Sequence, residues 1–200
     1  MGNAFDSVRD FEKVVAEYAG SKYAVAVDSC SNALFLCCLR ANVKDKIVTI
    51  PCRTYPSVPC AIIHAGGKVN FEDITWSGLY ELKPFAIYDG AKRFCRNMYV
   101  QNSLHCLSFH IKKHIPLGRG GMILTNNKDD YEWLKLMRFD GREECTLTEQ
   151  KNINVLGWNF YMSPELASRG LWLMGNIKDD NEDLEEVPPY PDLSKYKIYS

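Results

Sequence analysis

Residues 107–122 have the sequence LSFHIKKHIPLGRGGM and carry the clearest information about the fold. They join two apolar runs, residues 104–109 and 121–125, which have the length and composition of buried strands. Between these runs lie two adjacent lysines, Lys112 and Lys113, followed by a glycine-rich turn. The stretch therefore predicts two strands of one sheet, joined by a loop that places positive charge at the edge of that sheet.

The rest of the chain continues the pattern of short strands that alternate with helices. We expect helices at residues 6–19, 33–39, 58–64, 128–138 and 163–174, and further strands at residues 23–27, 47–51, 68–71 and 85–88. This alternation favours an α/β domain with a mainly parallel sheet. Ligands in such sheets bind beyond the carboxyl ends of the strands, so the residues that follow each strand are the candidates for chemistry.

The composition is that of an ordinary globular protein, with 200 residues and a formal net charge of −1. That charge argues against nucleic acid or an anionic membrane as a partner. No apolar run approaches the length of a membrane span, and the N-terminus lacks the apolar core of a signal peptide. The eight cysteines show no CxxC spacing, so we expect reduced thiols in a cytoplasmic protein and no metal site.

Three of the predicted strands are followed by residues that suit an anionic, aromatic ligand. Residues 28–34, DSCSNAL, lead into a helix N-terminus, where backbone N–H groups and hydroxyl side chains would bind an anion. The alternative for this turn is plain helix capping by serine and asparagine. Tyr55 would stack on a flat ring, or simply pack. Asp89 would hold a proton on a ring nitrogen, or cap a turn.

The two lysines at 112 and 113 have two interpretations. A lysine in a dry pocket that also holds phosphate can lose its proton and form a Schiff base with an aldehyde. The alternative is a basic loop exposed to solvent, which is the better interpretation for one isolated lysine. The choice between the two therefore depends on the motifs in the rest of the chain.

Six short motifs follow one another along the chain: SCSNAL at residues 29–34, PCRTY at 51–55, HAGGKVNFEDI at 64–74, YDGAK at 88–92, SFHIKK at 108–113 and GRGGMILT at 118–125. In order and spacing they resemble the DegT/StrS-type nucleotide-sugar aminotransferases, which are pyridoxal 5'-phosphate (PLP) enzymes of fold type I. The resemblance runs from about Phe11 to about Met174. It implies a three-layer α/β/α sandwich, with a PLP-binding large domain over residues 1–175. Residues 176–200 add an acidic, proline-containing tail or arm.

The resemblance also implies roles for individual residues. Lys113 matches the lysine that forms the Schiff base with PLP. Asp89 matches the aspartate that pairs with the ring nitrogen, and Tyr55 matches the aromatic residue that stacks on the ring. The contacts to the cofactor phosphate fall on Ser31, Asn32, Ser108 and Asn159. In the family, that asparagine reaches the phosphate of the neighbouring subunit, which implies a homodimer with shared active sites.

The implied reaction is amino transfer, from an amino-acid donor such as glutamate, to a keto group on a nucleotide-linked sugar. A dehydratase variant of the family has histidine in place of the lysine, so Lys113 favours transamination. Three positions depart from the family pattern. Cys30 replaces a glycine, and Tyr161 replaces an arginine. Lys92 replaces a neutral residue that lies near the ring oxygen in the family. The chain is also short, without most of the family's C-terminal domain. The alternative is therefore a catalytically impaired, truncated homologue that acts as a binding or assembly protein.

Overall fold

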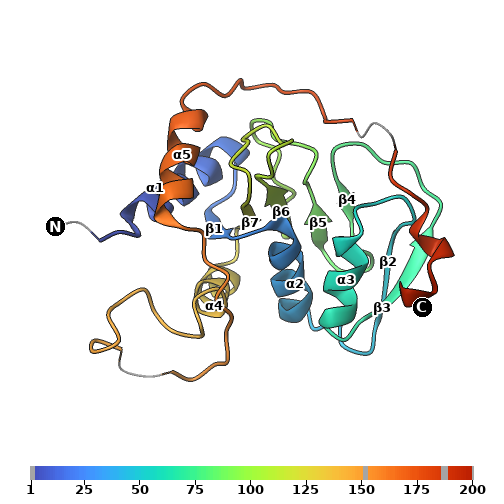
Figure 1. The fold of residues 1–200 in the computed structure, drawn as a ribbon, viewed down its shortest axis with the longest axis horizontal. Helices are drawn as coiled ribbons and strands as arrows, with labels where there is room; N and C mark the ends of the chain where they lie inside the picture. Colours follow the sequence, from blue (N-terminus) through green and yellow to red (C-terminus); the bar gives the residue numbers. More distant parts are fainter. Residues whose placement is uncertain (1–2, 151–152, 186–188, 200) are drawn as a thin grey trace.

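A five-stranded sheet with the order β1-β7-β6-β5-β4 forms the middle layer of the computed structural model, which describes residues 3–150, 153–185 and 189–199 (Figure 1). Its strands are β1 (Tyr23–Val27), β4 (Tyr80–Glu81), β5 (Ile87–Asp89), β6 (Leu104–Ser108) and β7 (Gly121–Thr125). Strands β5 and β6 are parallel, and each of the other neighbouring pairs is antiparallel.

Strands β2 (Ile47–Pro51) and β3 (Lys68–Glu72) form a parallel pair that continues this sheet beyond β4. Thr49 and Lys83 exchange two backbone hydrogen bonds, of 2.8 and 3.0 Å, as antiparallel partners. Strand β2 therefore runs in the same direction as β5, and so do β1, β3 and β6. Among the described strands only β4 and β7 run the opposite way. The prediction of a mainly parallel sheet is thus confirmed in strand direction, although most neighbouring pairs are antiparallel.

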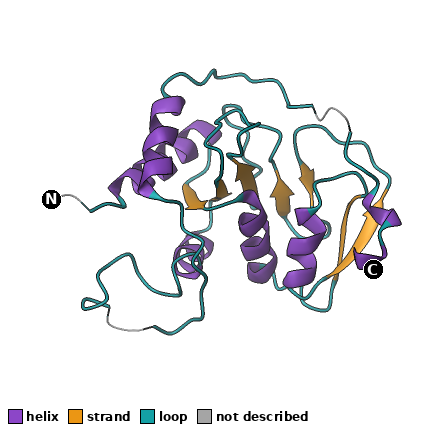
Figure 2. Cartoon of the chain, viewed as in Figure 1, coloured by secondary structure: helices purple, strands orange, loops and turns teal. Residues whose placement is uncertain are grey.

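Helices cover both faces of the sheet (Figure 2). One face carries α2 (Cys30–Arg40), α3 (Ser57–His64) and α4 (Lys128–Met137), and the other carries α1 (Asp6–Ala19) and α5 (Pro164–Met174). Side chains of β1 alternate between the two faces: Val25 and Val27 pack with α2, and Ala24 and Ala26 pack with α1. The predicted three-layer α/β/α sandwich is confirmed.

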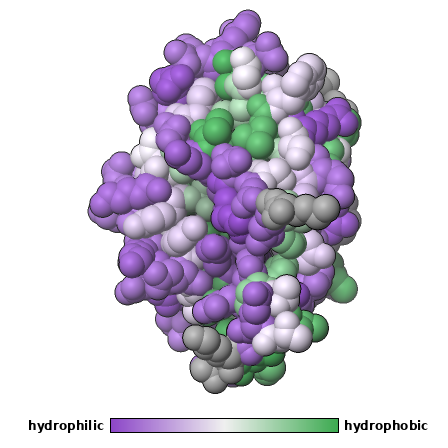
Figure 3. Space-filling model, turned by 90° about the vertical axis from the view of Figure 1, so that its left-hand side faces the viewer, coloured by the Kyte–Doolittle hydropathy of each residue, from purple (hydrophilic) through white to green (hydrophobic). Residues whose placement is uncertain are grey.

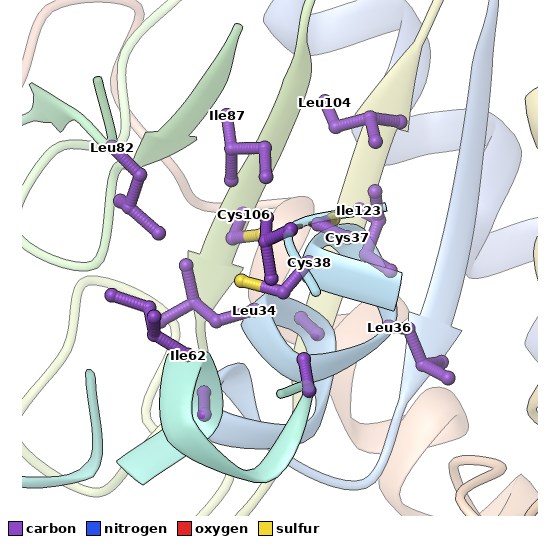
Figure 4. Packing of buried hydrophobic residues seen from close by; sticks show 14 of the residues in the cluster. Leu34, Leu36, Cys37, Cys38, Ile62, Leu82, Ile87, Leu104, Cys106 and Ile123 are labelled. Atoms are coloured by element: carbon purple, nitrogen blue, oxygen red, sulfur yellow. Dashed lines mark hydrogen bonds between the residues drawn. The ribbon is translucent and has the colours of Figure 1, made fainter. Parts of the chain in front are cut away.

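A hydrophobic core lies between the sheet and the layer of α2 and α3 (Figure 4). Leu34 on α2 and Ile62 on α3 are fully buried there, together with Ile87 and Cys106 from the strands. The Sγ atoms of Cys37 and Cys106 lie 3.4 Å apart in this core. All eight cysteines are free thiols, and the buried ones are Cys37, Cys38, Cys52 and Cys106. These buried thiols act as small apolar side chains.

The predicted helices and strands are confirmed, with differences of one to three residues at their ends. Helix α2 begins at Cys30, earlier than predicted, because the Ser29 hydroxyl caps it by accepting the backbone N–H of Asn32 at 3.2 Å. The sequence missed β4, because a strand of two residues is too short to show a hydrophobic period.

The predicted loop at 139–157 contains no helix or paired strand in its described residues, and residues 151–152 lie outside them. The buried guanidinium of Arg138 holds this loop to the domain, because it pairs with Glu12 on α1 and with Glu144 in the loop at 2.6 Å.

The side of the molecule that carries α1 and α5 is mainly hydrophilic, with a hydrophobic patch in its upper part (Figure 3).

After α5 the chain crosses the edge of the sheet toward β2 and β3 (Figure 1). It ends in two short 3-10 helices, η1 (Leu193–Lys195) and η2 (Lys197–Tyr199). Residues 186–188 and 200 of the predicted tail lie outside the described residues.

Within the described part of the chain, no helix is long and apolar enough to cross a membrane. No group of three or more His, Cys, Asp or Glu side chains there is placed to hold a metal ion.

Candidate active site

A cavity of about 530 Å³ opens at the edge of the sheet where the carboxyl ends of β1, β5 and β6 lie. This is the edge at which a mainly parallel sheet is expected to bind its ligand. Five of the seven predicted site residues line the cavity: Ser31, Tyr55, Asp89, Ser108 and Lys113. The fold therefore brings together residues that are spread from Ser31 to Lys113 along the chain.

Glycines at the start of β7 let this strand approach the N-terminus of α2. A Cβ atom on Gly121 would lie 2.5 Å from the backbone nitrogen of Cys30 and from the carbonyl carbon of Ser29. Gly120 has a φ of 136°, a conformation that residues with side chains rarely adopt. The close approach explains the glycine at 121, and it sets the first turn of α2 against one side of the cavity.

Asp89 is 5% exposed, and its carboxylate accepts two hydrogen bonds. Oδ1 accepts the backbone N–H of Ala91 at 3.0 Å, and Oδ2 accepts the hydroxyl of Tyr80 at 2.9 Å. Burial raises the pKa of Asp89, while these two bonds and the nearby charges of Lys113 and Lys92 lower it. A protonated ring nitrogen at this carboxylate would offset the cost of burying its charge, so the carboxylate fits a pyridinium ring.

Tyr80 and Thr54 support Asp89, although the sequence did not single out Tyr80. Tyr80 lies opposite Asp89 in the β4–β5 ladder, and its hydroxyl is 2.6 Å from Oγ1 of Thr54. Burial, and after it the charge of Asp89, raises the pKa of Tyr80 well above its usual value. Tyr80 therefore stays protonated and donates to the carboxylate. The sequence carried no signal for this contact, because it depends on the register of a two-residue strand.

Lys112 and Lys113 both line the cavity but differ in exposure. Lys113 is half-buried, and its charge acts on Asp89 and on the thiol of Cys30, whereas Lys112 is exposed. The backbone N–H of Lys113 donates to the carbonyl of His110 at 2.9 Å in the turn that leaves β6. The structure thus places Lys113 in electrostatic contact with the buried carboxylate.

Three hydroxyl groups and the N-terminus of α2 form one side of the cavity, which we call the hydroxyl wall: Ser29, Ser31, Ser108 and the first turn of α2. The Ser31 hydroxyl lies 2.6 Å from the Ser57 hydroxyl, which fixes its position. The first N–H groups of a helix have no partner inside the helix, and the helix dipole favours an anion there. This set of donors fits the phosphate group of PLP.

Asn32 and Asn159, the other two predicted site residues, do not line this cavity. The Asn32 amide donates to Asp28 at 2.6 Å, and the side chain lines a neighbouring pocket that shares Ser31 with the first. Asn159 is exposed, and its amide lies 3.3 Å from a carboxylate oxygen of Asp140. The predicted role of Asn159 toward a second subunit stays a prediction for this single chain.

The three positions that depart from the family pattern have different surroundings. Cys30 and Lys92 line the cavity. Tyr161 does not, because its ring packs against Phe5 at 5.4 Å and against Phe139 at 5.2 Å. The tyrosine therefore contributes to packing at the N-terminal end of the chain.

Several residues that the sequence did not single out also line the cavity, and four of them lie outside all the predicted motifs and helices: Trp76, Leu184, Glu185 and Tyr190. The last three belong to the segment that follows α5 and crosses the edge of the sheet (Figure 1). The acidic, proline-containing composition predicted a tail or arm for this segment, but composition alone does not show which part of the fold such a segment contacts.

Comparisons with known proteins agree with this geometry. The model of the DegT/DnrJ/EryC1/StrS aminotransferase family matches residues 2–89 and 86–188. The spore coat polysaccharide biosynthesis protein SpsC of Bacillus subtilis (strain 168) is 42% identical over 90% of this chain and 59% of its own length. A UDP-4-amino-4,6-dideoxy-N-acetyl-beta-L-altrosamine transaminase of Campylobacter jejuni is 25% identical, over 92% of this chain and 61% of its own length.

Solved structures show the same fold at lower identity. A crystal structure of 3-amino-5-hydroxybenzoic acid synthase superposes with a TM-score of 0.73 and 18% identity, over 86% of this chain and 56% of that chain. The Helicobacter pylori aminotransferase PseC superposes with a TM-score of 0.68, also at 18% identity, over 86% of this chain and 58% of that chain. The present chain thus spans about 60% of the length of the curated relatives named above. With its family model matched over nearly all residues, the chain belongs to the DegT/DnrJ/EryC1/StrS aminotransferase family.

Proposed function

We propose that this chain forms the PLP-binding part of an aminotransferase that moves an amino group from an amino acid, such as glutamate, to a keto group of a nucleotide-linked sugar. The observation that carries the proposal is that Lys113 and Asp89 share one cavity with the hydroxyl wall. An amine, a buried carboxylate and an anion site are the three contacts that the aldehyde, the ring nitrogen and the phosphate of PLP require.

Each side chain has one task in this proposal. Ser31 and Ser108 donate to the phosphate, and Tyr55 covers one face of the ring. Asp89 keeps a proton on the ring nitrogen. PLP, when bound, supplies an electron sink for the bond that breaks at the amino carbon. Lys113 would hold the cofactor, and its free amine would move a proton to and from the substrate carbon.

The relatives support the class of substrate, because one of them is named as a transaminase of a UDP-linked amino sugar. We place residues 1–175 in the PLP-binding unit and assign the rest to an arm that reaches the cavity. We also infer a homodimer, in which the exposed Asn159 reaches the partner's site, and a cytoplasmic location consistent with eight free thiols.

Reduction with borohydride tests the proposal, because it converts a C=N bond between PLP and a lysine into a stable C–N bond. Peptide mass spectrometry then locates the labelled residue. We expect labelling at Lys113, loss of the label in Lys113→Ala and full labelling in Lys112→Ala. The neighbouring Lys112 is the matched control, because it lines the same cavity but is exposed.

Glutamate added before the reduction should remove PLP from Lys113 and so lower the labelling. Labelling at Lys113 that glutamate leaves unchanged would point to the impaired homologue, a protein that keeps the cofactor site without turnover. The absence of any labelled lysine in the wild type would contradict the proposal.

A further inference from the structure

The buried hydrogen bonds behind Asp89 continue through Tyr80 to a third side chain, Thr54. We propose that Tyr80 and Thr54 are positioning residues, which keep the proton of the contact between Asp89 and PLP on the ring nitrogen of the cofactor. The three side chains are here called the Asp89 chain. This inference rests on the proposed function and adds two residues that act on the cofactor through Asp89.

The geometry gives the hydrogen bonds of the Asp89 chain one direction. The Tyr80 hydroxyl donates to Oδ2 of Asp89 at 2.9 Å, and it lies 2.6 Å from Oγ1 of Thr54. A tyrosine hydroxyl has a single hydrogen, so the oxygen of Tyr80 must accept the hydrogen of the Thr54 hydroxyl. Both donors therefore point toward the carboxylate. A protonated Asp89 would instead have a hydrogen of its own to donate, so the chain in this direction fits the ionised form.

Burial makes these hydrogen bonds strong and hard to replace. Thr54 is 1% exposed, and Tyr80 is 6% exposed. Bulk water is therefore not available as a substitute partner for either hydroxyl. Hydrogen bonds to an ionised group are stronger than those between neutral groups, and a low local dielectric strengthens them further. The loss of the Tyr80 hydroxyl would leave a buried charge with one donor fewer.

Three parts of the fold hold the Tyr80 ring in its place. Tyr80 lies directly opposite Asp89 in the β4–β5 ladder, which puts the two side chains on the same face of the sheet. The ring of Trp76 packs on that of Tyr80 with centroids 4.6 Å apart, and its indole N–H donates to the carbonyl of Arg53 at 2.9 Å. Thr54 follows Arg53 in the chain. The same turn after β2 therefore fixes both the neighbouring ring and the hydroxyl that donates to Tyr80.

Tyr80 is the neutral hydrogen-bond donor among the titratable groups that surround Asp89. The others are two thiols and two ammonium groups: Cys30 on α2, Cys106 on β6, Lys92 after β5 and Lys113 after β6. Burial raises the pKa of both thiols well above its usual value, so they stay neutral. The two lysines lower the pKa of Asp89 through their charge. Tyr80 acts through a directed contact, which remains when the charges in the cavity change.

The proton between a carboxylate and a ring nitrogen has two positions. On the nitrogen it leaves a charged ring beside a charged carboxylate, and on the carboxylate it leaves both groups neutral. Burial raises the pKa of Asp89 and favours the second position, whereas the hydrogen bond from Tyr80 lowers that pKa and favours the first. The protonated ring is the better electron sink. The Asp89 chain therefore offsets the effect of burial on the group that the cofactor needs in its ionised form.

Titration of the Asp89 carboxyl group in the full chain without PLP tests the inference. Carbon-13 NMR follows the ionisation in protein labelled at the aspartate carboxyl carbons, and Asp89→Asn assigns the signal. We expect the pKa of Asp89 to be higher in Tyr80→Phe than in the wild type. Tyr88→Phe is the matched control and should leave that pKa unchanged. It removes the same hydroxyl group from the neighbouring residue of β5, whose side chain points to the other face of the sheet.

Thr54→Val provides a second test should Tyr80→Phe fold poorly. This variant keeps the shape of the side chain and removes the hydroxyl that donates to Tyr80. It should raise the pKa of Asp89 in the same direction as Tyr80→Phe but by less, because it acts one hydrogen bond further away. Added to Tyr80→Phe, it should change nothing more, since Thr54 reaches Asp89 only through Tyr80. A further shift in the double variant would overturn the place of Thr54 in the chain.

The cofactor itself gives the second measurement, by nitrogen-15 NMR of bound PLP labelled at the ring nitrogen. We expect the signal of a protonated ring in the wild type and in Tyr88→Phe. In Tyr80→Phe the ratio of the two proton positions should move about tenfold toward the carboxylate, the size of one lost hydrogen bond to a charged group. A purely structural role of Tyr80 would lower stability without moving this signal.

These measurements separate the inference from the proposed function. A wild type that does not bind PLP contradicts the proposed function, while the carboxyl titration still decides whether Tyr80 controls Asp89. An equal pKa of Asp89 in the wild type and in Tyr80→Phe overturns the inference, even if PLP labels Lys113. A ring that stays fully protonated in Tyr80→Phe, although the pKa of Asp89 has risen, overturns it as well.

Discussion

The hydroxyl wall forms one side of the cavity, and Lys92 with the rings of Trp76 and Tyr190, here called the Lys92 cluster, forms another, but the two are built in different ways. The hydroxyl wall depends on backbone contacts between β7, a strand of the main sheet, and the first turn of α2, a helix packed on that sheet. The Lys92 cluster joins three loops, and one of its rings, Tyr190, arrives on the segment after α5. The difference shows that the hydroxyl wall is part of the core fold, whereas the opposite side of the cavity depends on the docking of a peripheral segment.

The largest effect is expected from Gly121→Ala, which breaks the contact beneath the hydroxyl wall. The new Cβ would lie 2.5 Å from backbone atoms of Cys30 and Ser29, and backbone cannot move aside as a flexible side chain can. We expect a loss of about 3 kcal/mol in the free energy of unfolding, at the upper end of overpacking effects. Urea denaturation followed by circular dichroism measures it.

Gly118→Ala is the matched control, since it adds the same methyl group in the same turn. A Cβ there meets nothing within 4 Å, so the cost comes only from the positive φ of 92°. That cost should be about 1 kcal/mol. Equal losses for the two variants would show that the close approach of β7 to α2 does not define the wall.

A second prediction concerns His105 on β6, a strand that supports both sides of the cavity. The ring is fully buried, and neither of its nitrogens has a hydrogen-bond partner among the described residues. Burial, together with the charge of Arg93, lowers the pKa of His105 from 6.5 to about 4. The folded protein therefore keeps a neutral ring where the unfolded chain already binds a proton.

The sign of the pH dependence follows from that difference. Above pH 6.5, His105 is neutral in both the unfolded and the folded state, so it does not lower the free energy of unfolding. As the pH falls from 6.5 to about 4, the unfolded chain binds a proton that the folded protein does not, and the free energy of unfolding decreases. Between pH 6.5 and 4 the wild type should lose roughly 3 kcal/mol more than His105→Leu, in which the group is absent. Urea denaturation at several pH values measures the slope for both proteins. Parallel slopes would exclude His105 as the cause.

The contrast between the two sides also explains how much the sequence could predict. The strands other than β4, the helix N-terminus at Ser29 and the residues Asp89 and Lys113 were predicted, because local patterns or motifs encode them. Tyr80 and Tyr190 were not predicted, since their positions depend on a two-residue strand and on docking between distant segments. Local sequence carries hydrophobic period and capping, but it does not carry the register of long-range contacts.

The third prediction weakens the docking of the C-terminal segment. Asp183 accepts two hydrogen bonds from the Arg93 guanidinium, at 2.7 and 2.6 Å, and a third from Ser77 at 2.9 Å. Asp183→Ala should lower the free energy of local opening by about 1.5 kcal/mol, so the segment is cleaved roughly tenfold faster in limited proteolysis. Labelling by PLP at Lys113 should persist, because the hydroxyl wall does not depend on this segment.

Asp179→Ala provides the control in the same segment. Its pair with Arg96 is much more exposed, with side-chain exposures of 71% for the acid and 50% for the base. Exposed pairs contribute little, so cleavage should change by less than about twofold. Equal acceleration in both variants, or loss of PLP labelling in Asp183→Ala, would remove the distinction between a core side and a docked side of the cavity.

The smallest effect is expected from Ser31→Ala in the hydroxyl wall, measured as the Kd for PLP by absorbance titration. The variant removes one hydroxyl donor while the N-terminus of α2 and the hydroxyl of Ser108 remain. The Kd should therefore rise only about fivefold, the size of one ordinary hydrogen bond. Ser57→Ala removes the hydroxyl that accepts a hydrogen bond from the Ser31 hydroxyl at 2.6 Å. Ser57 also lines the cavity, but it lies on α3 and not on the first turn of α2, so we expect it to raise the Kd less. A larger effect from Ser57 than from Ser31 would mean that the phosphate lies nearer to α3, and the hydroxyl wall would have to be redrawn around that helix.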